Sequence, residues 1–536
     1  MMIKRLLFGL LVLLMTNAVF AQRVTELPRL IEKDGRHALL VDGKPFLILG
    51  GQAHNSSAWP GMLPQVWTAI EAMHANTLEV PIYWEQIEPQ PGVFDFSVLD
   101  TLLVQARAHE VKLILLWFAT WKNGSNHYMP EWMKQDAKRY PNITGKDGRW
   151  VDSPSPHTQS AMELDAKAFT EVMKHLKEAD SQHTVIMVQV QNEPGAWGSV
   201  RDYSKTAQKL FDAQVPMELL KASVLNALNK PVVAKGTWTE VFGTDADEYF
   251  HAWSVAHYIE FVAAAGKKVN NLPLVVNAAL RDPLSNPSAD NYESGGPTDN
   301  VIPIWKAAAP SIDLLAPDIY LAGSERVLKV LELYSRPDNA LFVPEIRNSD
   351  EYARYLYAVL GHGGIGFSPF GIDDNGAGWS KAETEERYFL LGQDYATLRP
   401  MMHEMAQWCF DGKVKAVVEH EDREAQTIDL GAWKATISFG VPLRNRAKEE
   451  EKPFGKALIV SLGENEFLLM GTNCHFTFEP QGKNKGKAWQ YLKVEEGQYQ
   501  SGTFKLLRIR NGDETDWGGP RIGANPVVLH TTLVVR

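Results

Sequence analysis

The chain has 536 residues, 45% of them apolar and 22% charged, which is the composition of an ordinary globular protein. This composition excludes a disordered chain, a collagen and, with two cysteines, a disulfide scaffold. The 54 basic and 65 acidic residues give a net charge of −11, which argues against nucleic acid as a partner, since phosphate binding needs a dense positive face.

The first 21 residues have the pattern of a secretory signal peptide. Lys4 and Arg5 precede an apolar run over residues 6–15, and Ala21 places a small residue at the expected cleavage site. The run is too short to span a bilayer. We therefore expect export, to a bacterial periplasm or the cell exterior, and no membrane partner after cleavage.

Short apolar, β-branched runs recur along the chain and predict buried parallel strands, because such strands are covered on both faces. Helical patterns separate them, over residues 99–109, 165–176 and 353–360 among others. Eight such units favour a closed (β/α)8 barrel over an open sheet. The runs are 46–50, 77–82, 111–117, 184–191, 274–278, 312–317, 341–344 and 364–368. A spare candidate strand, residues 230–236, falls in a long insertion between the fourth and fifth.

The pattern changes after about residue 410. Short β-rich segments broken by Gly-containing turns predict an all-β, sandwich-like domain. We thus expect a barrel over 22–410 and a β-rich domain over 411–536. That domain braces the barrel, binds polysaccharide or mediates a homodimer, and bracing is favoured. Cys409 and Cys474 either pair in an oxidising compartment or stay as buried free thiols.

Two glutamates stand where the fourth and seventh predicted strands end, the end of a barrel at which active sites lie. Glu193 comes directly after residues 184–191, and Glu345 follows residues 341–344. Each alone fits an ion pair or a capping residue. Together they suit glycoside hydrolysis, which needs one carboxyl group as proton donor and another as nucleophile or base. Arg347 either holds the Glu345 carboxylate ionised or makes a structural ion pair.

The sequence around these positions resembles a known family. Residues 188–195 (VQVQNEPG) are similar to the V-Q-V-E-N-E-Y-G motif of glycoside hydrolase family 35, the β-galactosidases. Residues 83–96 (YWEQIEPQPGVFDF) are similar to its W-N-x-H-E-P-x-P-G-x-F-x-F segment. The family lies in the clan of retaining (β/α)8 glycosidases, so the resemblance implies Glu193 as the acid/base and Glu345 as the nucleophile.

The chain also departs from the family pattern. Gln191 and Pro194 replace a Glu and a Tyr, and residues 54–57 (HNSS) stand where many members have H-Y-x-R. The resemblance implies release of terminal β-galactosyl groups, plant cell-wall oligosaccharides among the substrates. The alternatives are a family 42-like or other clan glycosidase acting on β-glucosides, β-xylosides or arabinosides, and a non-catalytic saccharide-binding barrel.

Further side chains near the strand ends are candidates for substrate binding. Asn192 is expected to hydrogen-bond the sugar 2-hydroxyl. Tyr320 either donates its hydroxyl to Glu345 or only packs. Glu88 contacts sugar hydroxyls or, preferably, braces the rim, and His54 either touches substrate or has a structural role.

Sixteen tryptophans suit a saccharide cleft, because flat apolar sugar faces stack on indole rings. For any one of them, core packing is at least as frequent. The candidates that follow predicted strands are Trp84, Trp117, Trp121 and Trp197.

We expect no metal and no cofactor. Residues 403–407 (HEMAQ) do not complete the H-E-x-x-H zinc motif, and no cysteine pair has metal-ligand spacing. Residues 361–366 (GHGGIG) fit G-x-G-x-x-G but lead into a predicted strand instead of opening a helix, so they do not indicate a dinucleotide site.

Overall fold

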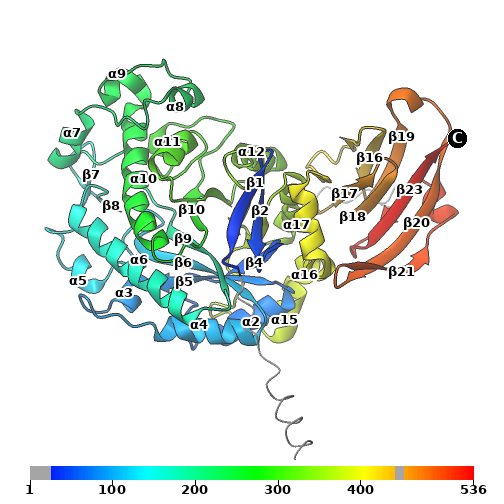
Figure 1. Cartoon of the computed structure of the whole chain (residues 1–536), viewed down its shortest axis with the longest axis horizontal. Coiled ribbons are helices and arrows are strands. Elements are labelled where there is room, and N and C mark those ends of the chain that lie inside the picture. Colours follow the sequence, from blue (N-terminus) through cyan, green and yellow to red (C-terminus); the bar gives the residue numbers. More distant parts are fainter. Residues whose placement is uncertain (1–25, 441–451) are drawn as a thin grey trace, which may run out of the picture.

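The computed structural model describes residues 26–440 and 452–536, and the predicted signal peptide lies outside them. Eight parallel strands close into a barrel and follow one another around it in chain order (Figure 1). Each overlaps one predicted run, which confirms the (β/α)8 barrel. The strands are β4 (Ile48–Gln52), β5 (Thr77–Tyr83), β6 (Lys112–Lys122), β9 (Val185–Asn192), β10 (Leu274–Ala279), β11 (Leu314–Ile319), β12 (Phe342–Ile346) and β13 (Gly366–Pro369).

The barrel strands are covered on both faces, as their continuous apolar runs require. Every residue of β5, β9, β11 and β12 is buried. Side chains of alternate residues fill the barrel interior, and the outer face packs on a ring of helices. The main helices after each strand are α2 (Leu63–Ala72), α4 (Ser97–Ala108), α6 (Gln159–Ala179), α10 (Ala246–Lys267), α11 (Ile302–Ala308), α12 (Ser324–Tyr334), α14 (Tyr355–Gly361) and α16 (Phe389–Leu398).

Each strand ends one or two residues later than its apolar run predicts, except β6, which ends five residues later. Consequently Glu345 lies inside β12, and β6 continues as far as Lys122. The extension matters for the site, because it moves side chains that were expected on the rim into the wall of the barrel.

The connection between β9 and β10 is the long insertion that the sequence predicts. It holds α7 (Lys205–Phe211), α8 (Ala222–Ala227) and α9 (Trp238–Phe242) before α10. The strand predicted over residues 230–236 is wrong: this stretch is irregular, and its Val232 is exposed. Its apolar side chains therefore do not contribute a ninth buried strand.

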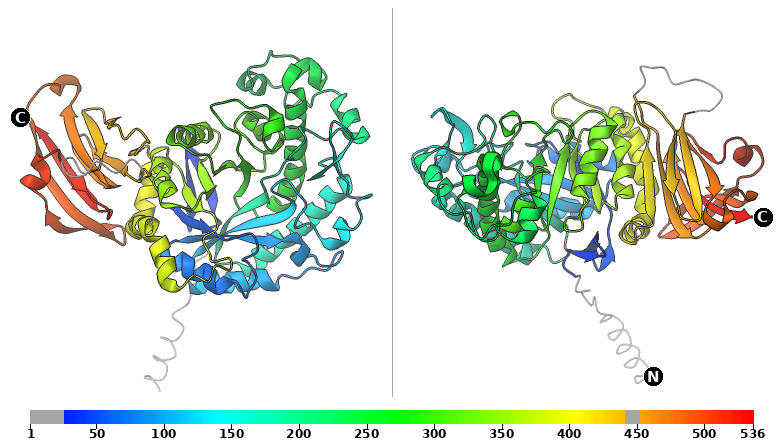
Figure 2. Two further views of the ribbon diagram at one scale, coloured as in Figure 1. Left: turned by 180° about the vertical axis from the view of Figure 1, so that it is seen from behind. Right: turned by 90° about the horizontal axis from the view of Figure 1, so that it is seen from above.

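The C-terminal part forms two antiparallel sheets, which confirms the predicted all-β region. They stand beside the barrel next to α16 and α17 (Met402–Phe410) (Figures 1 and 2). In spatial order, one sheet holds β14 (Val414–Val418), β17 (Lys456–Gly463), β18 (Glu466–Thr472), β23 (Val528–Val535), β20 (Trp489–Gln500) and β21 (Thr503–Ile509). The other holds β15 (Gln426–Asp429), β16 (Trp433–Phe439), β19 (Cys474–Pro480) and β22 (Arg521–Ile522).

The six-stranded sheet has two apolar faces because its side chains alternate. Leu458 and Val460 belong to the same core as the barrel, whereas Ala457 and Ile459 face the four-stranded sheet. The barrel and the β-sheets therefore share one continuous core on this side.

Both cysteines are buried free thiols, so the disulfide alternative is not realised. Cys409 lies on α17 and Cys474 on β19, in different cores. Burial raises the pKa of Cys409 to about 12, so this thiol is unreactive at neutral pH. Across residues 26–440 and 452–536, no helix combines the length and apolar character needed to cross a membrane.

Candidate active site

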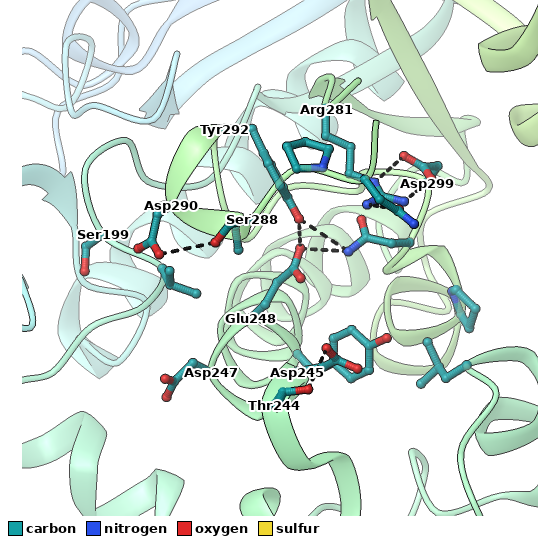
Figure 3. Close-up of a pocket in the computed structure, with 18 of the residues that line it drawn as sticks. Ser199, Thr244, Asp245, Asp247, Glu248, Arg281, Ser288, Asp290, Tyr292 and Asp299 are labelled. Atoms are coloured by element: carbon teal, nitrogen blue, oxygen red, sulfur yellow. Dashed lines mark hydrogen bonds and ion pairs between the residues drawn. The ribbon is translucent and has the colours of Figure 1, made fainter. Parts of the chain in front are cut away.

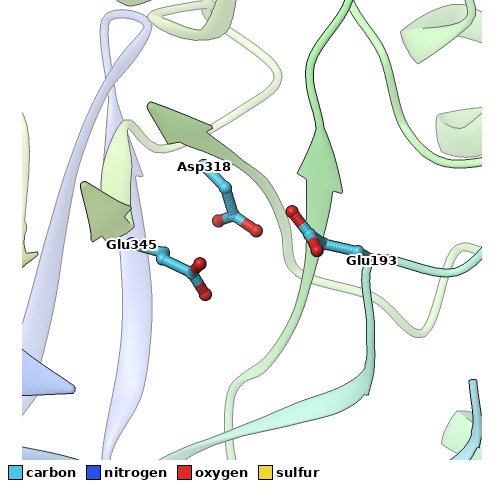
Figure 4. Close-up of side chains that lie close together, drawn as sticks. All are labelled: Glu193, Asp318 and Glu345. Atoms are coloured by element: carbon cyan, nitrogen blue, oxygen red, sulfur yellow. The ribbon is translucent and has the colours of Figure 1, made fainter. Parts of the chain in front are cut away.

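Three buried carboxyl groups meet at the carboxyl ends of the barrel strands (Figure 4). Glu193 follows β9, Asp318 lies in β11 and Glu345 in β12. One oxygen of each group lies within 4.8 Å of an oxygen of the other two. The three residues are only 7%, 2% and 5% exposed, respectively. The structure thus brings the two predicted glutamates together and adds an aspartate that the sequence analysis did not single out.

The backbone at Glu193 is held in an unusual conformation. Gln191 and Glu193 both have left-handed φ angles, 67° and 43°, which cost an ordinary residue about 1 kcal/mol or more. Asn277, on β10, accepts a hydrogen bond from the Glu193 amide nitrogen at 2.9 Å. The Gln191 side chain donates to Asp165 and accepts from the backbone of Trp121. These contacts fix the turn that points Glu193 into the barrel mouth.

The Glu193 carboxyl group has one oxygen occupied. Asn123 donates its amide to Glu193 Oε2 at 2.8 Å. Lys122 in turn donates to the Asn123 side-chain oxygen, and only 4% of Lys122 is exposed. The end of β6 therefore presents a buried cation and an amide to the acid/base candidate.

Glu345 has one oxygen hydrogen-bonded and one free. Tyr320 donates its hydroxyl to Glu345 Oε1 at 2.6 Å, as one of the two sequence interpretations expects. Oε2 is buried and has no hydrogen-bond partner among the described residues. Burial and the charge of Glu193 raise the pKa of Glu345 to about 7, although Lys122 and the Tyr320 hydroxyl act in the opposite direction.

Asp318 stands between the two glutamates. Asn277 donates to its Oδ2 at 2.6 Å, while Oδ1 has no partner in the part of the chain that the structure describes. Burial, followed by the charges of Glu345 and Glu193, raises the pKa of Asp318 well above its usual range. The same Asn277 amide therefore contacts both Asp318 and the Glu193 backbone.

Two other predicted contacts lie at the carboxyl ends of β9 and β4. Both side-chain atoms of Asn192 are buried without a partner among the described residues, so its amide is free to bind a ligand. His54 lies just after β4 and is anchored to Asp373, whose Oδ1 is 2.8 Å from the His54 backbone nitrogen and 3.2 Å from ring atom Nδ1.

Arg347 contacts neither catalytic carboxyl group and makes no ion pair among the described residues, so it takes neither of the two expected roles. It donates to the Tyr320 carbonyl oxygen at 3.2 Å and lies over the rings of Tyr320 and Tyr352. The cation near Glu345 is Lys122 instead.

Glu88 braces the rim, as the sequence analysis favours. It is fully buried and accepts hydrogen bonds from Trp84 Nε1 at 2.9 Å and from the Gly92 amide at 2.7 Å. Both oxygens accept hydrogen bonds within this loop, which fits the bracing role.

Three of the four candidate tryptophans are core residues, which corrects the stacking prediction for them. Trp84, Trp117 and Trp121 are fully buried, and Trp117 Nε1 donates to Asp165 at 2.8 Å. Trp117 belongs to the predicted run 111–117, and Trp121 lies inside β6 because that strand continues to Lys122. Trp197, in the loop after Glu193, is 54% exposed and has a face available.

Several residues near the site were missed, although most carry a visible signal. Glu79 and Asp318 are acidic residues inside otherwise apolar strands. Burying a charge there is costly, so both residues carry the same sequence signal as Glu193. Burial raises the pKa of Glu79 well above its usual range. Trp59, after β4, is exposed and stacks on Tyr83 with ring centroids 6.2 Å apart. Glu293 offers no comparable signal, because it lies in a long loop.

A separate cavity of about 840 Å³ lies on the insertion between β9 and β10 and its neighbouring loops (Figure 3). None of the three carboxyl groups lines it. Its polar groups pair with one another: Arg281 contacts Asp299, and Tyr292 and Asn300 donate to Glu248. We therefore place the candidate active site at the barrel mouth.

Two family models match the chain. Residues 60–256 match the model of glycoside hydrolase family 42, described as β-galactosidase. Residues 391–519 match a family described as a domain of unknown function, DUF5597. The first match contains β5, β6, β9 and Glu193. Family 42 is the alternative named from the sequence, and membership of family 35 stays a prediction.

Related proteins match part of the chain. A β-galactosidase of Xanthomonas manihotis is 25% identical over 207 residues, which are 37% of this chain and 31% of that protein. β-Galactosidase 11 of Arabidopsis thaliana is 30% identical over 105 residues, which are 18% of this chain and 12% of that protein. The matches thus span less than a third of these curated relatives. The crystal structure of a β-galactosidase from Rahnella sp. R3 gives a TM-score of 0.48 at 15% identity, over 68% of this chain and 58% of that one.

Proposed function

We propose that the protein is a retaining glycoside hydrolase that releases terminal β-galactosyl groups. The observation that carries the proposal is the pair of buried carboxyl groups, Glu193 and Glu345, with oxygens within 4.8 Å of each other. Retaining enzymes hold their two carboxyl groups about 5–5.5 Å apart, whereas inverting enzymes leave roughly 6.5–9.5 Å for a water molecule. The spacing here favours retention.

The galactosyl specificity draws on the comparisons. The family model over residues 60–256 and the two relatives carry the name β-galactosidase. Oligosaccharides of plant cell walls are the substrates we infer, and β-glucosides, β-xylosides and arabinosides are the alternatives. We infer export from the signal-peptide pattern of residues 1–21.

The side chains have distinct roles in the double displacement. Glu193 gives its proton to the leaving oxygen as the bond from that oxygen to the anomeric carbon breaks, and Glu345 bonds to the same carbon. Water then attacks the anomeric carbon, Glu193 takes its proton, and the bond to Glu345 breaks. The two carboxyl groups supply acid, base and nucleophile, so these steps use no cofactor.

Neighbouring groups assist this cycle. Tyr320 holds Glu345 Oε1, which leaves Oε2, the oxygen without a partner among the described residues, as the attacking atom. The free Asn192 amide binds the sugar 2-hydroxyl, a contact that strengthens in the transition state. Trp197 and His54 line the approach to the site as substrate contacts.

Covalent trapping tests the proposal. Incubation with an activated 2-fluoro-galactoside should inactivate the enzyme, and peptide mass analysis should find the sugar on Glu345. The Glu345→Gln variant is the matched control and should take no label. A label on another residue would overturn the nucleophile assignment. No label with any 2-fluoro glycoside would favour the saccharide-binding alternative.

A second assay decides the sugar. Aryl β-galactoside, β-glucoside, β-xyloside and α-arabinoside should be compared at equal concentration. We expect the highest kcat/KM for the galactoside, and a higher value for another glycoside would reassign the substrate.

A further inference from the structure

Asp318 is the third carboxyl group at the barrel mouth, and the double displacement written above gives it no role. It is 2% exposed, and only its Oδ2 receives a hydrogen bond within the described residues, from Asn277. A buried carboxylate oxygen without a donor is costly. Asp318 must therefore hold a proton or share one with a neighbouring group.

The neighbour best placed to share it is Glu193. Asn123 occupies Glu193 Oε2, so Oε1 is the oxygen left for a proton. Asn277 accepts from the Glu193 backbone and donates to Asp318, which fixes the two residues relative to one another. An oxygen of Glu193 lies within 4.8 Å of an Asp318 oxygen, and the charge of Glu193 contributes to the raised pKa of Asp318. Two carboxyl groups this close do not both ionise readily, as in other carboxyl dyads.

We propose that Asp318 is a positioning residue for Glu193: the two carboxyl groups hold one proton between them, and the negative charge they share keeps that proton available to Glu193 until the leaving oxygen takes it. This inference rests on the proposed glycosidase function. It assigns to Asp318 an effect on the acid/base, with no direct contact to the reacting atoms.

The proposal explains how one residue serves as acid and then as base. Before the first step, Glu345 is ionised and the pair of Glu193 and Asp318 carries one proton. After the step Glu345 is an ester, and the pair has lost its proton to the leaving group. The net charge of the three groups is unchanged. The ionised Asp318 then makes Glu193 a stronger base toward water.

Other charged or titratable groups also face the pair. They are Glu345, Tyr320, Lys122 and Glu293, together with Tyr334 from α12. Because these groups stay in place in an Asp318 variant, a change in the pH profile reports on Asp318 itself.

The test is the pH dependence of kcat/KM for a phenyl β-galactoside in Asp318→Asn. The amide keeps the shape of the side chain but removes the charge and can donate to Glu193, so Glu193 should lose its proton at lower pH. We expect the basic limb of the pH profile to move to lower pH by at least about one unit. In Asp373→Asn, an aspartate on the same rim that contacts His54 and Ser57, the basic limb should not move.

A second substrate separates this effect from a structural one. A dinitrophenyl galactoside has a leaving group that needs no proton, so Asp318→Asn should keep its kcat/KM within a few-fold of the wild type. An equal loss on both substrates at every pH, with an unshifted basic limb, would overturn the proposal.

A measurement that needs no turnover distinguishes this inference from the proposed function. In protein carrying ¹³C at the glutamate side-chain carboxyls, the Glu193 signal is assigned by its loss in Glu193→Gln. Its titration midpoint should fall in Asp318→Asn. If the Glu193 titration midpoint falls in Asp318→Asn but the protein cleaves no glycoside, the proposed function is rejected and the shared proton is supported. If the enzyme cleaves the galactoside but the midpoint does not change, the function is supported and the shared proton is rejected.

Discussion

At the scale of single residues, the titration of Glu345 governs activity. Its pKa of about 7 arises from burial first and from the charge of Glu193 second. A nucleophile must be ionised, so activity should be lost as pH falls through about 7. The raised pKa is the cost of placing the nucleophile beside an acidic group in a buried cleft.

Replacing Glu193 removes its part of the negative charge that it shares with Asp318. This should lower the pKa of Glu345, because the charge of Glu193 is one of the two causes that raise it. In Glu193→Gln, the acidic limb of kcat/KM for a dinitrophenyl galactoside should therefore move to lower pH, by about one unit. Steady-state rates across pH 4 to 9 measure it.

Tyr320→Phe is the control, in which the acidic limb should shift in the opposite direction. It removes the hydrogen bond that lowers the pKa of Glu345, so its acidic limb should move to higher pH. If the acidic limb of the pH profile in Glu193→Gln stays in place or moves to higher pH, the two carboxyl groups do not interact.

The two glutamates were predictable because each closes an apolar run, and a charge at such a place needs a reason. Asp318 carries the same signal inside the run LLAPDI, but its role depends on Asn277, which comes from a neighbouring strand about 40 residues earlier. Contacts across strands are set by the closure of the barrel, and a single sequence does not display them.

At the scale of elements, the positions of all eight barrel strands follow from composition, while their ends do not. Strand β6 continues through residues 118–122, beyond the predicted run 111–117, and it still pairs with β9 at Lys122 and Asn192. This difference of a few residues determines which tryptophan side chains are buried and which are exposed. Trp121 is fully buried in the wall of the barrel, whereas Trp197, beyond the end of β9, remains exposed.

The loop after β5 offers a test of bracing against substrate binding. In Glu88→Ala, Trp84 Nε1 and the Gly92 amide lose their acceptor inside the protein. We expect a loss of about 1–3 kcal/mol in the free energy of unfolding, measured with urea, because buried donors are left unsatisfied. The KM for an aryl galactoside should stay within about twofold, since Glu88 already satisfies these donors.

Glu85→Ala is the matched control for this loop. Glu85 pairs with Lys134 where both side chains are about one-third exposed, so its loss should cost at most about 1 kcal/mol. A large rise in KM in Glu88→Ala without a loss of stability would restore the sugar-contact interpretation.

At the scale of the whole molecule, the barrel and the β-sheets are joined by buried polar contacts as well as by a common core. Lys456 on β17 forms an ion pair with Asp394 on α16, and both side chains are almost fully buried. Arg354, fully buried, donates to the carbonyl oxygen of Pro453 and to Glu421. Such contacts favour bracing as the role of the C-terminal sheets.

The ion pair between Asp394 and Lys456 provides the last prediction. Asp394→Ala leaves the Lys456 charge buried and unpaired, which typically costs about 3–5 kcal/mol, and thermal unfolding should begin at a clearly lower temperature. The double variant Asp394→Leu with Lys456→Met removes both charges and should recover most of the loss, because buried pairs are often replaceable by apolar residues. Lys434→Ala, which breaks an exposed cross-strand pair with Glu479, should change stability by at most about 1 kcal/mol. Calorimetry distinguishes the outcomes: if Asp394→Ala unfolds at the wild-type temperature, the pair does not hold the two parts together.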